Sequence, residues 1–213
     1  MHVGHIKMTA WKKLKENCDN CKKCSLHKNR KQAVLGDGWK ESPLMFVGEG
    51  PGKNEDVEGI PFTGKAGILL DKCLERAILP RDSVYITNIV KCRPHEINPA
   101  TGYDRNRQPT QEEIDACNEH LITQVKLVKP YFILCIGSPA AKTVIRPDFS
   151  ITKERGLLFN SVFNIPSMAC LHPAYILRQD EPMYSSLLDQ LVEDLRLAKK
   201  ETRKIAQERG LDR

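Results

Sequence analysis

Residues 44–52 read LMFVGEGPG, and this stretch decides the fold class of the chain. The apolar run 44–47 predicts a buried strand that ends at Gly48. A loop rich in Gly and Pro, residues 48–64, follows directly. In open α/β sheets, the loops at the carboxyl ends of parallel strands hold the ligand site. The stretch therefore predicts an α/β protein whose site lies along one edge of its sheet.

The same order of strand and helix recurs along the chain. Further strands are expected at 84–87, 132–136 and 162–170. Helices are expected at 65–77, 110–129, 140–145 and from 184 to about 210. Thr110 starts its helix as an N-cap hydroxyl, with a carboxylate three residues on. The polar residues 95–110 are expected to form a long surface loop. The order of elements predicts a parallel α/β sandwich.

Composition excludes several classes of protein. Of the 213 residues, 40% are hydrophobic and 28% are charged, which is typical of a globular domain and not of a disordered chain. No apolar run approaches the roughly 18 residues that span a bilayer. The first residues also lack the apolar core of a secretory signal. We therefore expect an intracellular, cytoplasmic protein with no targeting signal and no membrane partner.

Basic residues gather at both ends of the chain. Residues 1–40 carry 10 Lys/Arg against 3 Asp/Glu, and residues 195–213 carry 7 against 3. The segment between them carries 16 against 21. Basic flanks on a nearly neutral body indicate a polyanionic partner. The alternative is that Lys and Arg simply solvate two terminal helices.

Eight cysteines are many for this length, and without a secretory signal they are expected to stay reduced. The spacing Cys21-x-x-Cys24 suits two thiolate ligands of one metal centre, and two further ligands must come from elsewhere in the chain. A thiolate pair plus two scattered cysteines favours a 4Fe-4S cluster over zinc, which remains the alternative. Cys73 and Cys135 are expected to be core thiols, whereas Cys18 could join the N-terminal cluster or point away.

Four segments stand out together, in this order: GEGPG at 48–52, PFTG at 61–64, TNIVKCRP at 87–94 and LHPAYILR at 171–178. With these motifs the sequence resembles the family 4 uracil-DNA glycosylases, the iron–sulfur branch of that superfamily. The resemblance covers roughly residues 18–198. It implies a three-layer sandwich with a four-stranded parallel sheet flanked by helices. It also implies excision of uracil from DNA, which leaves an abasic site, and a cluster held by Cys21, Cys24, Cys92 and Cys117.

The resemblance also implies how the base would be bound. A base inside a duplex must be flipped into a pocket before it can be excised. Phe62 is placed to stack on it, although a core position under the loop is the alternative. The carboxamide of Asn88 suits the edge of uracil, because it offers one acceptor and two donors. The Gly50 N–H can lie against the base, and Glu55 supplies a second acidic group nearby.

Two residues are expected to break the glycosidic bond. His172 can donate a hydrogen bond to the uracil O2 and stabilise the departing anion. Glu49 is expected to orient the attacking water and to stabilise the cationic sugar. Arg178 and the segment 175–177 resemble the part of the family that enters the duplex and contacts phosphate.

The sequence thus predicts a single glycosylase-like domain, 1–213, with a basic N-terminal helix at about 1–20 and a basic helical tail at about 199–213. We expect a monomer that acts on DNA containing uracil. The alternative is a catalytically silent or modified-base-specific nucleic-acid-binding protein of the same fold. A zinc-stabilised α/β enzyme on another substrate is a third hypothesis.

Overall fold

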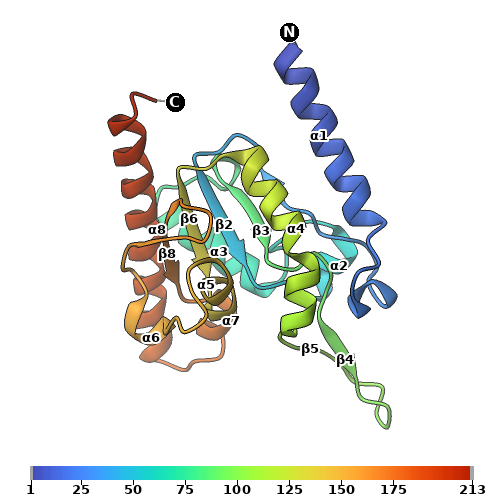
Figure 1. Cartoon of the computed structure of the whole chain (residues 1–213). Helices are drawn as coiled ribbons and strands as arrows, with labels where there is room; N and C mark the ends of the chain where they lie inside the picture. The colour runs from blue at the N-terminus through green and yellow to red at the C-terminus, as the bar shows by residue number, and fades with distance from the viewer. Residues whose placement is uncertain (1, 212–213) are drawn as a thin grey trace.

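The computed structural model describes residues 2–211, with side chains from residue 6 onward (Figure 1). Residue 1 of the predicted N-terminal helix and residues 212–213 of the predicted tail lie outside the described residues. No helix in the described part of the chain combines the length and apolar character that crossing a membrane requires.

The main sheet is mixed, and within residues 2–211 it has six strands in the order β1-β3-β2-β6-β8-β7. The four central strands run parallel, whereas the two-residue edge strands β1 and β7 pair antiparallel. The α/β class was predicted, but a purely parallel four-stranded sheet is not what forms. Edge strands this short leave no periodic signal in a sequence. The strands are β1 (Asp37–Gly38), β2 (Leu44–Gly48), β3 (Tyr85–Asn88), β6 (Phe132–Ile136), β7 (Phe159–Asn160) and β8 (Pro166–Cys170).

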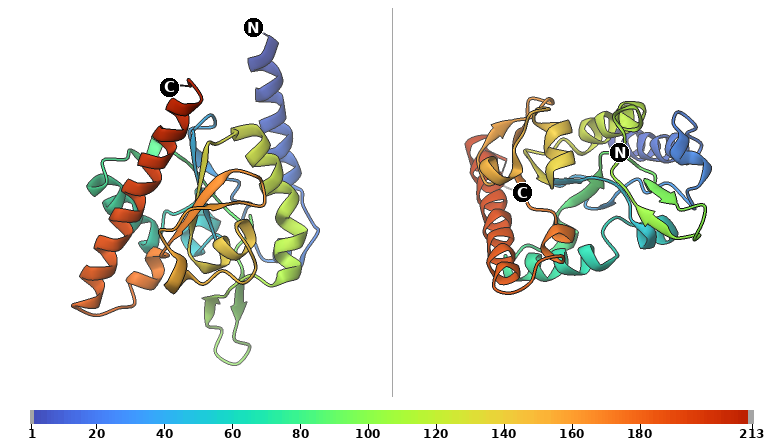
Figure 2. Two further views of the ribbon diagram at one scale, coloured as in Figure 1. Left: turned by 60° about the vertical axis from the view of Figure 1, so that its left-hand side comes forward. Right: turned by 90° about the horizontal axis from the view of Figure 1, so that it is seen from below.

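Helices cover both faces of this sheet, so that two cores form (Figure 2). One core lies between the sheet and the helices α3, α7 and α8, and the other lies between the sheet and α1, α4 and α5. The helices are α1 (His2–Asp19), α2 (Lys53–Glu58), α3 (Lys65–Arg76), α4 (Gln111–Val128), α5 (Ser138–Val144), α6 (Ile151–Glu154), α7 (Pro173–Ile176) and α8 (Met183–Glu208), with 3-10 turns at Ser25–Lys28 and Arg81–Ser83.

Helix α4 begins where the sequence predicted. The Thr110 hydroxyl accepts from the Glu113 N–H at 3.3 Å, and the Glu113 carboxylate accepts from the Thr110 N–H at 2.9 Å. This reciprocal capping box satisfies two backbone donors that the first turn would otherwise leave unpaired. The helix ends at Val128, and its C-cap residue Lys129 has a left-handed φ of +55°.

The expected surface loop over 95–110 is wrong, because a small hairpin forms there. Strands β4 (His95–Ile97) and β5 (Asp104–Asn106) pair antiparallel and project from the body (Figure 1). The charged side chain of Asp104 anchors the hairpin: it accepts from Arg93 at 2.8 Å and pairs with His95 at 2.9 Å. The hairpin is stabilised by the buried Arg93, which is 5% exposed. It lacks the alternating apolar residues that would have predicted strands from the sequence.

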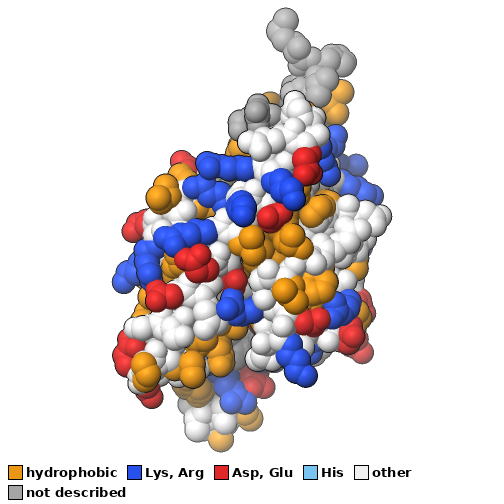
Figure 3. All heavy atoms as spheres, turned by 90° about the vertical axis from the view of Figure 1, so that its left-hand side faces the viewer, with side chains coloured by type: hydrophobic (Ala, Val, Ile, Leu, Met, Phe, Trp, Pro, Cys, Tyr) orange, Lys and Arg blue, Asp and Glu red, His pale blue; other side chains and the backbone are white. Residues whose placement is uncertain are grey.

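The two chain ends lie at the pole of the molecule opposite this hairpin (Figures 1 and 2). Lys199, at the start of the predicted basic tail, and Arg196, just before it, make structural contacts. They donate to the main-chain carbonyls of Ile78 and Arg76, at the end of α3. On the face that carries α8, Lys and Arg are interspersed with Asp, Glu and apolar side chains (Figure 3). This distribution fits a solvated helix better than a basic patch.

Candidate active site

A pocket of about 910 Å³ opens at the carboxyl ends of the four parallel strands. Each of these strands contributes a residue at or just past its end, namely Glu49 after β2, Gly137 after β6 and His172 after β8, with Asn88 closing β3. The register of β2 and β3 places Gly48 opposite Asn88. The seven residues predicted to bind substrate or DNA or to catalyse all line this pocket: Glu49, Gly50, Glu55, Phe62, Asn88, His172 and Arg178.

The carboxamide of Asn88 is poised for a ligand. The residue is only 2% exposed, and its Oδ1 is a buried acceptor without a hydrogen-bond partner among the described residues. A buried polar atom of this kind is uncommon and costs stability unless something binds it. A Cβ on Gly48 would lie 2.4 Å from this oxygen and 2.7 Å from the Phe62 ring. Gly48 therefore keeps open the space where the amide and the ring meet.

Phe62 is held in a backbone conformation that aromatic residues rarely adopt. Its φ is +55°, and its side chain is 7% exposed. The carboxylate of Glu55 accepts from the next two backbone N–H groups, Thr63 at 3.0 Å and Gly64 at 2.8 Å. Glu55 thus braces the loop that presents Phe62. Strain that is stabilised in this way is typical of functional loops.

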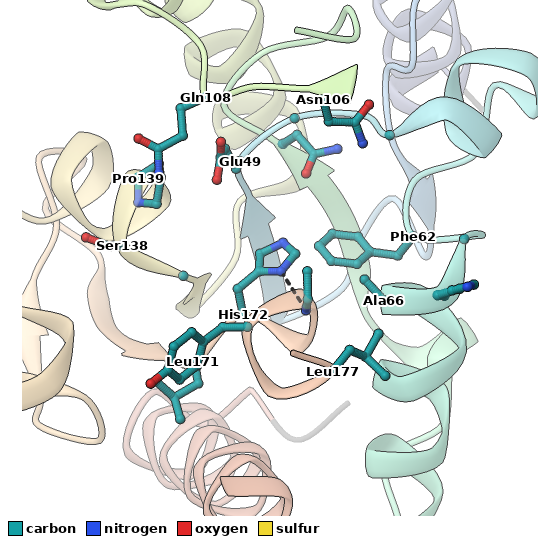
Figure 4. Close-up of a pocket in the computed structure, with 18 of the residues that line it drawn as sticks. Glu49, Phe62, Ala66, Asn106, Gln108, Ser138, Pro139, Leu171, His172 and Leu177 are labelled. Atoms are coloured by element: carbon teal, nitrogen blue, oxygen red, sulfur yellow. Dashed lines mark hydrogen bonds between the residues drawn. The ribbon is translucent and has the colours of Figure 1, made fainter. Parts of the chain in front are cut away.

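His172 points into the pocket beside Phe62 (Figure 4). It is the N-cap of α7, and its Nδ1 accepts from the Ala174 N–H at 3.1 Å. An acceptor nitrogen carries no proton, so Nε2 carries the proton of the neutral ring. Burial, with a smaller contribution from the positive charge of the nearby Arg178, lowers the pKa of His172 to about 4. The side chain is therefore a neutral hydrogen-bond donor at physiological pH.

Glu49 lies across the pocket from His172 (Figure 4). Burial raises its pKa from 4.5 to about 7, and the positive charge of Arg178 partly opposes this rise. The carboxylate has no hydrogen-bond donor among the described residues. A carboxyl group that titrates near neutral pH and has a free hydrogen-bonding edge suits proton transfer with water.

Gly50 is constrained by the protein itself. A Cβ there would lie 2.9 Å from Val90 Cγ2 and 3.2 Å from the Pro94 ring. The missing side chain thus leaves room for the turn after β3.

Several lining residues were missed from the sequence. Asn106 and Gln108 come from the unexpected hairpin and its exit, and Ser138 and Pro139 begin α5 (Figure 4). The Oδ1 of Asn106 accepts from Arg93 Nε at 2.7 Å, which fixes the amide, and its NH₂ has no hydrogen-bond partner among the described residues. The one feature of the sequence that could have indicated Asn106 was Arg93, a charged residue within the third motif.

The four cysteines predicted as ligands gather outside the pocket, on the α1 side of the sheet. Cys21 and Cys24 follow α1, Cys92 follows β3, and Cys117 lies on α4. All are free thiols, and each lies within electrostatic range of at least one of the others. Among the described residues, no group of three or more His, Cys, Asp or Glu is close enough to hold one metal ion.

Hydrogen bonds to two of these sulfurs fit thiolate ligands. The Lys91 N–H points at Cys117 Sγ at 3.3 Å, and Arg30 Nη1 points at Cys92 Sγ at 3.1 Å. Donors and cations around sulfur are what a thiolate-bound centre requires. The donor set therefore fits such a centre. Cys18 is buried near Cys92 and Cys117, and Cys73 and Cys135 are buried core thiols, as expected.

Comparison with known proteins gives a consistent result. Residues 35–196 match the model of the uracil DNA glycosylase superfamily. A type-4 uracil-DNA glycosylase of Thermotoga maritima is 37% identical over 185 residues, which is 86% of this chain and 90% of that protein. The protein of the same name from Pyrobaculum aerophilum is 39% identical over 174 residues, 78% of this chain and 84% of that protein. The one from Sulfurisphaera tokodaii is 42% identical over 154 residues, 70% of this chain and 66% of that protein.

Proposed function

The chain belongs to the uracil DNA glycosylase superfamily, and from this premise we propose that it is a DNA repair enzyme that removes uracil from DNA. The reaction hydrolyses the N-glycosidic bond and leaves an abasic site. The observation that carries the proposal is the unpartnered, buried Oδ1 of Asn88, which shares one pocket with a neutral His172 and with Phe62.

Binding begins with a flipped nucleotide, since the pocket cannot reach a base inside the duplex. In this proposal the uracil lies against the Phe62 ring. Asn88 Oδ1 accepts from uracil N3–H, and its NH₂ donates to O4. A hydrogen bond from N3–H would satisfy the buried Asn88 Oδ1, which has no partner among the described residues. Cytosine has no N3–H and carries an amino group at position 4, so it mismatches both contacts.

Bond breaking places negative charge on the departing base. Nε2–H of His172 donates to uracil O2 as the C1′–N1 bond breaks and its electron pair moves onto the base. A neutral imidazole suits this role because its N–H donates a hydrogen bond to the anion while the proton stays on the ring. Burial of the ring strengthens the interaction, since the surrounding dielectric is low.

Glu49 acts on the water that replaces the base. In this proposal its carboxylate orients the water oxygen toward C1′ and stabilises the cationic sugar. The water proton then passes to the carboxylate and on to solvent, while uracil and an abasic site are released. The nearby Arg178 contacts the DNA phosphate beside the flipped nucleotide.

We further propose that Cys21, Cys24, Cys92 and Cys117 hold a 4Fe-4S cluster, with zinc as the alternative. The group supplies a crosslink between the segment after α1, the turn after β3 and helix α4, and the reaction needs no chemistry from it. Visible absorption of the purified protein at about 400 nm distinguishes a 4Fe-4S cluster from zinc, because only thiolate-bound iron absorbs there.

A direct test measures excision from oligonucleotides that carry one modified base, with alkaline cleavage at the abasic site. We expect cleavage of a U:G duplex by the wild-type protein and loss of it in Asn88→Ala. Asn160→Ala, on the exposed end of β7, is the matched control and should stay active. Binding without cleavage would instead support the silent protein. Cleavage only of hypoxanthine, xanthine or 5-hydroxymethyluracil would support the modified-base alternative.

A further inference from the structure

Lys91 carries a charge that is buried without an acidic partner. Its side chain is 1% exposed, and Nζ donates to two neutral oxygens, Thr87 Oγ1 at 2.9 Å and the main-chain carbonyl of Asn88. Among the described residues no carboxylate forms an ion pair with it. A buried ammonium costs several kcal/mol unless an anion balances it. A negative charge near Lys91 would offset this cost.

The groups that face Lys91 are the thiols of the cysteine centre. Cys117, Cys18 and Cys92 lie within its electrostatic range, and its own backbone N–H donates to Cys117 Sγ at 3.3 Å. Four thiolates carry more negative charge than either a zinc ion or an oxidised 4Fe-4S core neutralises. A loaded centre thus provides the anion that Lys91 lacks.

Arg30 is a second cation at this centre, but its contacts differ. Its guanidinium donates to Cys92 Sγ and to the main-chain carbonyls of Cys18 and Asp19, at the end of α1. No contact of Arg30 reaches the pocket. In contrast, Lys91 Nζ contacts the main-chain carbonyl of Asn88, the residue whose Oδ1 has no partner among the described residues. The backbone carbonyl of Lys91 also accepts from Val34 N–H at 2.7 Å, which fixes the turn from the other side.

We propose that Lys91 is a positioning residue that links the metal centre to base recognition. The negative charge of the thiolate-bound centre attracts the Lys91 ammonium, and the ammonium donates a hydrogen bond to the Asn88 main-chain carbonyl. The Asn88 carboxamide is thereby positioned for uracil. Arg30 balances charge at the same centre without this second contact. The inference rests on the proposed function, because it takes Asn88 as the uracil reader and the four cysteines as ligands.

The test compares Lys91→Met with Arg30→Met. Each removes one cation from the centre, but only Lys91→Met releases Asn88. The first measurement is the midpoint potential of the centre in anaerobic redox titration. Both variants should lower it, because a nearby cation favours the more negative reduced cluster. Thermal melts check that both variants are folded.

The second measurement is binding to two duplexes. One carries the non-cleavable analogue 2′-fluoro-2′-deoxyuridine, and the other carries a tetrahydrofuran abasic analogue. Lys91→Met should weaken binding of the uracil analogue by about tenfold or more, as expected for a lost charge-assisted hydrogen bond, and leave abasic binding unchanged. Arg30→Met should leave both affinities unchanged. Wild-type potential in Lys91→Met, or an equal loss on both duplexes, overturns the proposal.

If Lys91→Met fails to fold, Lys91→Gln takes its place, since it keeps a polar donor but no charge. It should lower the potential as much as Lys91→Met would, and an unchanged potential overturns the proposal. The wild-type protein is measured first. If it does not excise uracil from a U:G duplex, the proposed function itself fails, and this inference fails with it. If it excises uracil but lacks iron absorbance, the centre is not an iron–sulfur cluster, and this inference alone fails.

Discussion

The imidazole of His172 stacks beside the ring of Phe62, with centroids 5.8 Å apart and planes inclined by 29°. The two rings come from loops more than a hundred residues apart in the chain. The Phe62 loop is braced by Glu55, and His172 is fixed by its own hydrogen bond to Ala174. Because each ring packs on the other, the residues proposed to bind the base and to break the bond are positioned together.

Replacing His172 with Ala should slow excision without preventing DNA binding. Loss of one donor to a developing anion typically lowers the rate by about 100- to 1000-fold. Single-turnover assays on a U:G duplex measure the rate, and anisotropy with an abasic duplex measures binding. Gln179→Ala, just beyond α7, is the control and should behave as the wild type. Near-wild-type excision by His172→Ala would mean that the anion is stabilised elsewhere.

Replacing Glu55 with Ala should destabilise the protein and weaken uracil binding. Two backbone N–H groups would lose their buried acceptor, at about 1–3 kcal/mol each, and the strained Phe62 would lose its brace. The melting temperature and the affinity for a non-cleavable uracil duplex measure the two effects. Glu55→Gln keeps an oxygen for both donors and should recover most of each. Full affinity in Glu55→Ala would show that Phe62 needs no such brace.

The pH dependence of excision should follow Glu49. Its carboxylate is active when ionised, so the single-turnover rate should rise with pH through about 7. His172, with a pKa lowered to about 4, stays neutral across that range and adds no second limb. The variant Glu49→Gln should be slow and insensitive to pH between about 5 and 8. A rate that falls above pH 6 would contradict these roles.

The same group links pH to stability. The folded state raises the pKa of Glu49 from 4.5 to about 7, so it binds the Glu49 proton more tightly than the unfolded chain does. Glu49 therefore contributes more to the free energy of unfolding below pH 4.5 than above pH 7, and this contribution declines between the two pH values. Glu49→Gln should remove that decline. Denaturant melts of both proteins at pH 5 and 8 measure the difference, and equal changes in both would assign it to other residues.

Removing residues 199–213 should leave the salt dependence of DNA binding unchanged. The sequence suggested that the basic ends bind a polyanion, but both ends lie at the pole opposite the hairpin that lines the pocket. The cations that line the pocket include Lys53, Lys65 and Arg178. Lys65→Ala should reduce the slope of log affinity against log salt by about 1, because one phosphate contact is lost. A smaller slope after truncation would place DNA on the tail as well.

The central strands and the loops after them could be predicted from sequence because apolar runs that end in Gly are strong local signals. Asn88 and His172 were identified because each lies at the end of a predicted strand, in one of the four motifs that carry the family resemblance. The β4–β5 hairpin could not be predicted, since its stability comes from Arg93 and Asp104 across the chain and not from alternating apolar residues. For the same reason Asn106 was missed, although it lines the pocket.

The last prediction separates base reading from catalysis. Asn88→Asp replaces a donor and acceptor with a carboxylate that repels uracil O4 and cannot donate to it. Excision from U:G should therefore be lost, even though His172 and Glu49 remain in place. A carboxylate accepts from an amino group, so weak excision of cytosine from C:G is expected to appear. The site is only 2% exposed, so the new charge should also lower the melting temperature. Asn160→Asp, on the exposed edge strand β7, controls for the added charge. If Asn88→Asp still excises uracil at the wild-type rate, Asn88 does not read the base, and recognition rests on backbone groups around Gly50 and Phe62.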